Sequence, residues 1–186
     1  MQAKSIAILG AGNVGAALAR VWAACGHTIA FGVPDPKSET VKLALAALGG
    51  KGRADNNKEA VFSSEIVALC VPWNHAEEAI RTSGSLTGKV LVDCTNPLST
   101  DVQRLVVGST TSAAEQVASW ASGARVVKAF NTIGAVNFGN AQFGAQRADG
   151  FYCGDDDAAK SIVRDLIACA GLDPRCNMHR LNGGNR

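Results

Sequence analysis

The sequence predicts an α/β fold with a doubly wound, mainly parallel sheet and helices on both faces. Three observations predict it. Short aliphatic runs alternate with segments of helical spacing along most of the 186 residues. A glycine-rich turn at residues 10–15 joins the first aliphatic run directly to the first helical segment. The run EIVALCV at residues 65–71 is almost continuously apolar, which is typical of a strand buried on both faces of a sheet.

Six strands are expected from the aliphatic runs. Right-handed crossovers between parallel strands give the order 3-2-1-4-5-6. One or two further strands are expected toward the C-terminus, beginning with GFYC at residues 150–153. The six expected strands are residues 5–9, 28–33, 52–54, 65–71, 89–94 and 124–130.

The first helices are placed by their spacing and by the residues that bound them. A helix over residues 16–25 has an apolar face and ends at Gly26. Asp35 and Pro36 are typical of an N-cap and a first helical position, so a second helix is expected over residues 37–48. A short third helix is expected over residues 58–62.

Capping residues place the later helices. Asn74 with Glu77 three residues on, and Ser112 with Glu115, have the spacing of a capping box. Helices are therefore expected to begin at these two sites, the second of them ending near residue 121. A final helix is expected over residues 156–170, with Asp155 as its cap.

Composition bounds the class of protein. With 186 residues and 47% apolar content, we expect a single domain over residues 1–174 and a C-terminal tail over residues 175–186. A net charge of +2 without a run of Lys or Arg argues against a nucleic-acid partner. Glycines, Asn13 and Arg20 interrupt the apolar stretch at residues 6–24, so no membrane span is expected. Six cysteines without a CxxC pair predict free thiols and a cytoplasmic location.

The glycine-rich turn has the spacing of a dinucleotide-binding fingerprint. In GAGNVG, Gly10 permits a tight turn, Gly12 lets a pyrophosphate approach the backbone, and Gly15 permits close helix packing. The phosphates would lie at the N-terminus of the helix that follows. Because the motif lies between a strand and a helix, it predicts a nucleotide site in a fold of the Rossmann type.

The end of the second strand leaves the choice of cofactor open. Asp35 lies about twenty residues past the last fingerprint glycine, where an acid usually meets the ribose hydroxyls. The same side chain could instead cap the next helix. Lys37 is the nearby cation that could meet a 2′-phosphate. NADP(H) and NAD(H) therefore both remain open from these residues.

Three further strand ends carry candidate site residues. Val71, Pro72 and Trp73 leave the fourth strand where the strand order reverses, and His75 could donate a hydrogen bond to cofactor or substrate. His75 could equally be a solvent-facing helix residue, and Trp73 could be no more than a wall of the crevice. Residues 93–98 and 128–135 end the fifth and sixth strands at the same edge, which brings Asn96 and Asn131 toward a nicotinamide or leaves them as loop caps.

Few residues are available for acid-base chemistry. The chain has three histidines, and neither a Ser, His and Asp set at matching strand ends nor a metal-ligand cluster can be found in its sequence. The catalytic candidates are therefore His75, Asn131 and Lys128. Lys128 could act as an acid in imine or carbonyl reduction, or could pack its stem within the sixth strand. Hydride transfer to a flavin-like ring needs mainly stacking and distance.

Several motifs in one order resemble a known family. ILGAGNVG, VPWNHA, LVDCTNPL, TTSAAEQVASW, VVKAFNTIGA and CGDDDAAK resemble the NADP oxidoreductases that act on the deazaflavin coenzyme F420. They are also similar to the cytosolic NADPH domain of the six-transmembrane ferric reductases. The resemblance runs from about residue 5 to residue 174. It implies NADPH bound by the backbone at residues 11–14, with a deazaflavin or flavin stacked on the nicotinamide. The expected cofactor-binding residues are Gly10, Ala11, Gly12, Asn13, Val14, Gly15, Val33, Pro34, Asp35, Lys37, Ser38, Val71, Pro72, Trp73, His75, Asn96 and Ala129.

One departure from the family bears on the cofactor. Val33 and Pro34 stand where the family usually has a Ser-Arg pair, whose Arg grips the 2′-phosphate. The expected activity is hydride transfer between NADP(H) and a deazaflavin or flavin-like acceptor. A flavin or ferric reductase domain, and an NADP(H)-binding module without turnover, are the alternatives. A small-molecule acceptor is the expected partner. A homodimer is also expected, because it would cover apolar surface left exposed where the acceptor binds.

Overall fold

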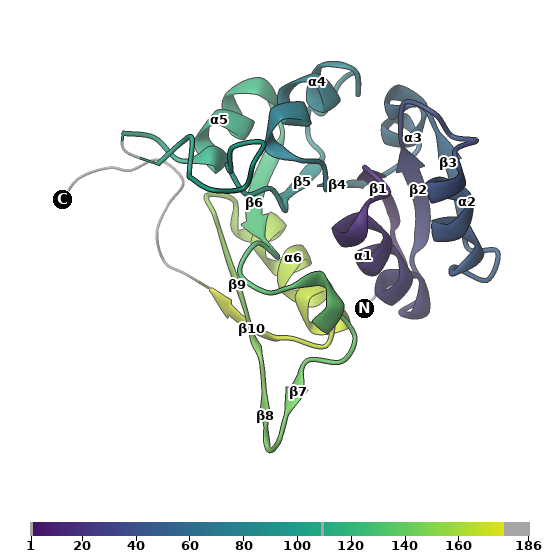
Figure 1. The fold of residues 1–186 in the computed structure, drawn as a ribbon, viewed down its shortest axis with the longest axis vertical. Helices are drawn as coiled ribbons and strands as arrows, with labels where there is room; N and C mark the ends of the chain where they lie inside the picture. Colours follow the sequence, from purple (N-terminus) through teal and green to yellow (C-terminus); the bar gives the residue numbers. More distant parts are fainter. Residues whose placement is uncertain (1, 109, 177–186) are drawn as a thin grey trace.

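The computed structural model describes residues 2–108 and 110–176, which form one eight-stranded sheet and a small separate hairpin (Figure 1). The strand order is β10-β9-β6-β5-β4-β1-β2-β3, and all neighbours are parallel except the antiparallel pair β6 and β9. The order 3-2-1-4-5-6 with two added C-terminal strands is thereby confirmed. The strands are β1 (Ser5–Leu9), β2 (Thr28–Gly32), β3 (Gly52–Asp55), β4 (Ile66–Leu69), β5 (Val90–Asp93), β6 (Arg125–Ala129), β9 (Asp149–Gly154) and β10 (Asp173–Cys176).

Helices cover both faces of the sheet because its strands are apolar on both sides. Along β1, Ile6 and Ile8 pack in one core with α1, α2 and α6, whereas Ala7 and Leu9 pack in a second core with α3, α4 and α5. This alternation follows from the two-residue period of a strand. The helices are α1 (Asn13–Ala24), α2 (Glu39–Ala46), α3 (Asn57–Phe62), α4 (Ala76–Arg81), α5 (Ala113–Trp120) and α6 (Asp157–Cys169).

One helix begins, and another ends, where the bounding residues predict. The Ser112 hydroxyl accepts from the Glu115 amide at 3.1 Å, and the Glu115 carboxylate accepts from the Ser112 amide at 2.5 Å. This reciprocal pair confirms the predicted capping box of α5. At the first helix, α1 ends at Ala24 and Gly26 follows with a φ of 95°, as expected for a glycine that ends a helix.

The predicted start of α2 is wrong by two residues. Asp35 does not cap the helix, because its Oδ1 accepts a 3.0 Å hydrogen bond from the Lys37 amide and closes a local turn. The Ser38 amide donates to the Asp35 carbonyl oxygen at 3.2 Å, which continues this turn. The helix therefore begins at Glu39, with Ser38 as its N-cap residue.

The predicted caps of α4 and α6 are also wrong. After Pro72 the chain forms a 3-10 turn, η1 (Trp73–His75), and the His75 amide donates to the Pro72 carbonyl oxygen at 2.9 Å. The α-helix can begin only after this tighter turn, so Asn74 is not its cap. In α6 the cap is Asp156 rather than Asp155, since its Oδ1 accepts from the Ala159 amide at 2.7 Å.

A hairpin after β6 was not predicted. Strands β7 (Gln142–Phe143) and β8 (Gln146–Arg147) pair antiparallel and project from the body of the molecule (Figure 1). Both are short and exposed, so no alternating apolar pattern marks them in the sequence.

The strand predicted at residues 150–153 lies inside β9. β10 continues to Cys176, so residues 175 and 176 belong to the sheet, and the rest of the predicted tail lies outside the described residues.

The prediction of six free thiols is wrong for two cysteines. Cys25, just after α1, forms a disulfide with Cys169 at the end of α6, with a Cα–Cα distance of 6.3 Å. The pair is 144 residues apart in the sequence, and only the packing of α1 against α6 brings it together. The Trp22 indole supports this packing, because its Nε1 donates to the Leu166 carbonyl oxygen at 3.1 Å.

Candidate functional site

Two cavities open along the carboxyl-terminal edge of the sheet, on either side of the end of β1. The first, of about 570 Å³, lies between the end of β2 and the helices α3 and α4. The second, of about 550 Å³, lies beyond the ends of β4 and β5. Val71 and His75 line both cavities, which therefore adjoin and together make up one crevice at the point where the strand order reverses. Open α/β sheets bind ligands at this point.

The glycine-rich loop forms the floor of the crevice. Gly10 has a φ of 101°, and a Cβ on it would lie 2.8 Å from the Cys70 carbonyl oxygen, so a side chain is excluded. A Cβ on Gly15 would overlap the Gly10 carbonyl oxygen. Above Gly12, in contrast, a Cβ would meet nothing within 4 Å. Two glycines thus serve packing, while Gly12 leaves open space in front of α1.

The N-terminus of α1 faces the second cavity. Gly12, Asn13 and Val14 line it, and the N-cap residue Gly12 makes no side-chain hydrogen bond to the first turn. The first turn also carries no acidic residue. The free amides and the helix dipole therefore favour an anion, as a pyrophosphate would be. Ala11 is different, since it is 7% exposed and packs in the core.

The wall at the end of β2 is apolar. Val33 and Pro34 line the first cavity, and the Val33 amide is held by the Asp55 carbonyl oxygen at 3.1 Å. The three polar candidates that follow, Asp35, Lys37 and Ser38, are not among the residues that line either cavity. The Asp35 Oδ1 accepts from the Lys37 amide in the turn described above.

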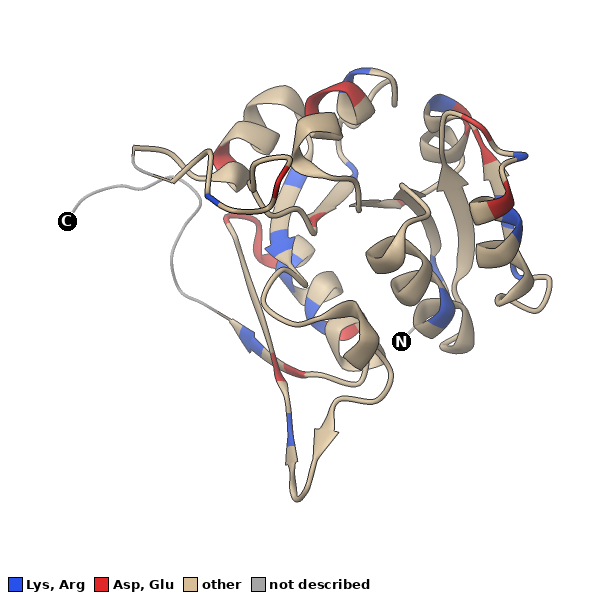
Figure 2. Cartoon of the chain, viewed as in Figure 1, with Lys and Arg blue, Asp and Glu red and all other residues tan. Residues whose placement is uncertain are grey.

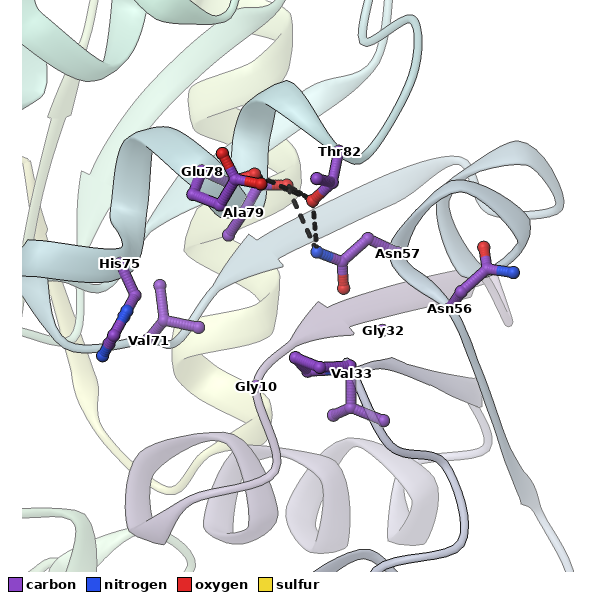
Figure 3. Close-up of a pocket in the computed structure, with 11 residues that line it drawn as sticks. Gly10, Gly32, Val33, Asn56, Asn57, Val71, His75, Glu78, Ala79 and Thr82 are labelled. Carbon is purple, nitrogen blue, oxygen red and sulfur yellow. Dashed lines mark hydrogen bonds between the residues drawn. The ribbon is translucent and has the colours of Figure 1, made fainter.

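Asn57, which was not predicted as a site residue, contributes a polar group to the first cavity. Its Nδ2 donates to Thr82 Oγ1 at 2.8 Å and to the Ala79 carbonyl oxygen at 3.4 Å, which orients the amide (Figure 3). Its Oδ1 is buried and has no hydrogen-bond partner. A buried acceptor without a partner is costly, so this oxygen is suited to accept a hydrogen bond from a ligand in the cavity. The sequence signal was weak, because Asn56 and Asn57 follow a strand as an ordinary helix start.

Aromatic and imidazole side chains line the second cavity. The ring of Trp73 packs on Trp120 of α5, with centroids 5.2 Å apart and an interplanar angle of 36°, which holds it at the wall. His75 is exposed, and its Nε2 lies 3.3 Å from the Asn74 Nδ2. Pro72 lies beside them in the lining. These three predicted residues are brought together at the crevice as expected from their position after β4.

The asparagines at the ends of β5 and β6 meet, but in unequal roles. Asn96 lines the second cavity, and its Nδ2 donates to the Asn131 carbonyl oxygen at 3.2 Å. Asn131 thus contributes a backbone atom to this contact, and it is not among the lining residues. Ala129 is fully buried in the core, so its side chain lies away from the crevice.

Lys128 is held in a buried ion pair. Its Nζ lies 3.0 Å from Asp93 Oδ2 and also contacts the Thr95 carbonyl oxygen. The Asp93 side chain is completely buried, and its Oδ1 accepts from the Thr95 amide at 2.9 Å and from the Thr95 hydroxyl at 2.7 Å. Lys128 lines neither cavity. The arrangement ties the ends of β5 and β6 together and does not direct the ammonium group at the crevice.

Charge and metal-ligand chemistry add little to this site. Basic and acidic segments are interspersed along the outer elements, and α1 carries almost no charge (Figure 2). Within residues 2–108 and 110–176, no group of three or more His, Cys, Asp or Glu side chains could hold a metal ion. No helix in the same ranges is long and apolar enough to cross a bilayer.

Known proteins share parts of this sequence, and solved structures share its fold. The Metalloreductase STEAP3 of Rattus norvegicus is 30% identical over 179 residues, which cover 93% of this chain. The chain spans about one third of the length of that relative, 33%. A solved protein of Arthrobacter sp. FB24, proposed to be an F420-dependent NADP-reductase, superposes with a TM-score of 0.86 at 26% identity, covering 96% of this chain and 86% of that one.

Two further solved structures extend the comparison. The hypothetical protein SMa0349 of Sinorhizobium meliloti has a TM-score of 0.82 at 26% identity, with 93% of this chain and 84% of that one covered. A reductive aminase of Aspergillus terreus, solved with NADPH, has a TM-score of 0.68 at 19% identity, with 95% of this chain and 55% of that one covered. This likeness shows the fold alone.

The family model for coenzyme F420-dependent NADP oxidoreductases matches residues 5–97, half of the chain. The chain therefore belongs to the coenzyme F420-dependent family of NADP oxidoreductases.

Proposed function

We propose that this protein transfers a hydride between NADP(H) and a deazaflavin or flavin-like acceptor. The observation that carries the proposal is the crevice of two adjoining cavities, with open space above Gly12 at the N-terminus of α1 and an unpaired acceptor on Asn57. A dinucleotide has an anionic centre and two heterocyclic ends, and the crevice offers a suitable wall for each. Membership of an NADP oxidoreductase family supports the same cofactor.

The adenosine half would occupy the first cavity. Val33 and Pro34 supply an apolar surface for the ribose and adenine, and the Asn57 Oδ1 supplies one directed acceptor. The amides at the start of α1 would bind the pyrophosphate without a charged side chain. The described residues lining this cavity include no Lys or Arg, so the preference for a 2′-phosphate is expected to be weaker than that of relatives with an Arg here.

The ring end would occupy the second cavity. A bound nicotinamide supplies or accepts the hydride, and the residues around it have to orient it and exclude water. Pro72, Trp73 and Asn96 are placed to do so from the ends of β4 and β5. Leu98 and Val102, in the loop after β5, form an apolar wall against which a flat acceptor ring could lie. With Lys128 engaged by Asp93, the site is better suited to hydride transfer between rings than to imine or carbonyl reduction.

A second candidate is the reduction of ferric chelates through a bound flavin. The 30% identity to the Metalloreductase STEAP3 favours it, although this chain spans about one third of that protein. The same crevice would hold the nicotinamide cofactor in both cases. The two candidates therefore differ only in the acceptor and can be separated by one assay.

The test is a binding titration followed by an acceptor screen. NADPH and NADH are titrated in parallel, following energy transfer from tryptophan to the reduced nicotinamide. Coenzyme F420, FMN, FAD and ferric chelates are then offered with saturating cofactor, and Gly12→Leu is the matched inactive control. Turnover with F420 or a flavin that is lost in Gly12→Leu supports the proposal. Cofactor binding without turnover on any acceptor contradicts it and favours a binding module.

A further inference from the structure

Two cysteines lie side by side in the crevice. Cys70 and Cys94 immediately follow β4 and β5, whose register places Leu69 opposite Asp93. The Cys94 amide donates to the Leu69 carbonyl oxygen at 3.2 Å, so the ladder continues to these positions. Residues opposite each other on adjacent strands point to the same face, and the strands lie about 4.8 Å apart. That spacing is within the Cα range of disulfides, roughly 4.4 to 6.8 Å.

Cavity lining and burial agree with this placement. Both thiols line the second cavity, and both pack against the same hydrophobic core. Cys70 is half-buried, whereas Cys94 is 6% exposed and lies deeper. A hydrogen bond from the Cys94 thiol to the Cys70 sulfur, together with burial, raises the pKa of the Cys94 thiol well above its ordinary value. Cys70 is therefore the thiol that a reagent from solvent reaches first, with Cys94 in contact behind it.

We propose that Cys70 and Cys94 are a redox-active thiol pair that hydroperoxides oxidise to a disulfide, and that bound cofactor shields this pair. This shielding rests on the proposed function, because it requires a dinucleotide in the crevice. The Cys70 backbone also approaches the first fingerprint glycine, since a Cβ on Gly10 would lie 2.8 Å from its carbonyl oxygen. Oxidation at Cys70 would therefore occur directly beside the cofactor loop.

The chemistry balances with the hydroperoxide as the oxidant. The Cys70 sulfur attacks the terminal peroxide oxygen; the S–O bond forms, the O–O bond breaks, and an alcohol or water leaves. The Cys94 sulfur then attacks the sulfenic sulfur of Cys70; the S–S bond forms and water leaves. Two thiols supply the two electrons that reduce the peroxide. An external dithiol reverses the reaction by exchange.

The other cysteines provide internal references. Cys25 and Cys169 are already joined in a disulfide. Cys153 lies in β9 opposite Lys128 and does not line the cavity, and burial raises its thiol pKa. Cys176 is exposed on β10. The experiment therefore uses a Cys176→Ser background, with Cys153→Ser as the matched control.

The test is differential alkylation after treatment with tert-butyl hydroperoxide, followed by peptide mass spectrometry. We expect a Cys70–Cys94 linked peptide that a dithiol removes and that forms at least severalfold more slowly with saturating NADP⁺. Cys94→Ser should stop at a Cys70 sulfenic acid that dimedone traps, and Cys153→Ser should behave as the background. Unlinked Cys70 and Cys94 after complete peroxide consumption would overturn the proposal.

Calorimetry on the same samples separates this proposal from the proposed function. If NADP⁺ binds but does not slow the oxidation, the shielding is wrong and the cofactor site stands. If NADP⁺ does not bind while the linked peptide forms, the thiol pair stands as a redox site, its shielding is overturned, and the proposed function fails.

Discussion

Asn57 donates its side-chain amide to Thr82 Oγ1 across 2.8 Å, and this bond leaves its Oδ1 buried and unpaired beside the first cavity (Figure 3). The hydrogen bond joins the start of α3 to the end of α4. Because the amide is oriented before any ligand binds, the orphan oxygen is a preorganised acceptor.

Asn57→Ala should weaken NADPH binding by roughly three- to tenfold, since a hydrogen bond of this kind contributes about 0.5 to 1.5 kcal/mol. Thr82→Val is the matched control, because it removes the partner of Nδ2 and keeps Oδ1. Its affinity should stay within about twofold of the native value. Equal losses in the two variants, measured by titration, would show that the contact acts only through the packing of α3 and α4.

Substitution of Gly12 should affect cofactor binding, whereas substitution of Gly15 should affect the stability of the fold. Gly12→Leu projects a side chain into the open space before α1, so NADPH affinity should fall by at least about tenfold, while the free energy of unfolding changes by less than about 1 kcal/mol. Gly15→Ala should lower the free energy of unfolding by about 1 to 3 kcal/mol, because its Cβ overlaps the Gly10 carbonyl oxygen. Urea unfolding and titration measure both effects. The opposite pattern would move the phosphate site away from Gly12.

Lys128→Met should act mainly on stability. Removing one partner of a buried ion pair costs about 3 to 5 kcal/mol, and Asp93 keeps only its bonds from Thr95. The double variant Asp93→Asn with Lys128→Met should recover part of this loss, since no buried charge is then unpaired. Urea unfolding measures the stability, and turnover per folded molecule should persist in both variants. If the Lys128→Met protein folds and binds NADPH but transfers no hydride, Lys128 would instead be assigned as a proton donor.

Pro34→Arg should raise the preference for NADPH over NADH. A charge-assisted hydrogen bond to the 2′-phosphate contributes about 1.5 to 3 kcal/mol, which corresponds to a tenfold or greater gain for NADPH alone. Pro34→Ala is the control for loss of the proline ring. The parallel titration with both cofactors measures the ratio. An equal gain for NADH would mean that the new guanidinium contacts the pyrophosphate instead.

His27 should make stability depend on pH. Burial lowers the pKa of its imidazole, and the Nδ1 accepts from the Lys4 amide at 3.1 Å while Nε2 has no partner. The unfolded chain takes up a proton as the pH falls through about 6.5, whereas the folded chain resists protonation. Stability should therefore be full above that pH and decrease below it, by at most about 1.4 kcal/mol per pH unit. His27→Gln, compared by urea unfolding at several pH values, should show a shallower decrease; an unchanged slope would assign the effect to other groups.

Much of the fold could be predicted because its determinants are local. The apolar runs of β1, β4, β5 and β6, the glycine turn and the Ser112–Glu115 capping box are contiguous in the chain. The misplaced caps at Asp35, Asn74 and Asp155 were also local, but there a competing turn or a neighbouring carboxylate satisfied the backbone first. Short-range patterns therefore located the helices and erred at their ends.

The sequence by itself determined the doubly wound sheet, the glycine loop and the strand ends that line the crevice. Hydrophobic periodicity and glycine spacing are formed by residues close together in the chain, so they can be recognised without the structure. Only the tertiary structure decided which side chains meet across it. The Lys128–Asp93 pair, the Cys25–Cys169 disulfide and the unpaired Oδ1 of Asn57 each depend on elements far apart in sequence. Partners of this kind are set by packing and register, and no local pattern encodes them.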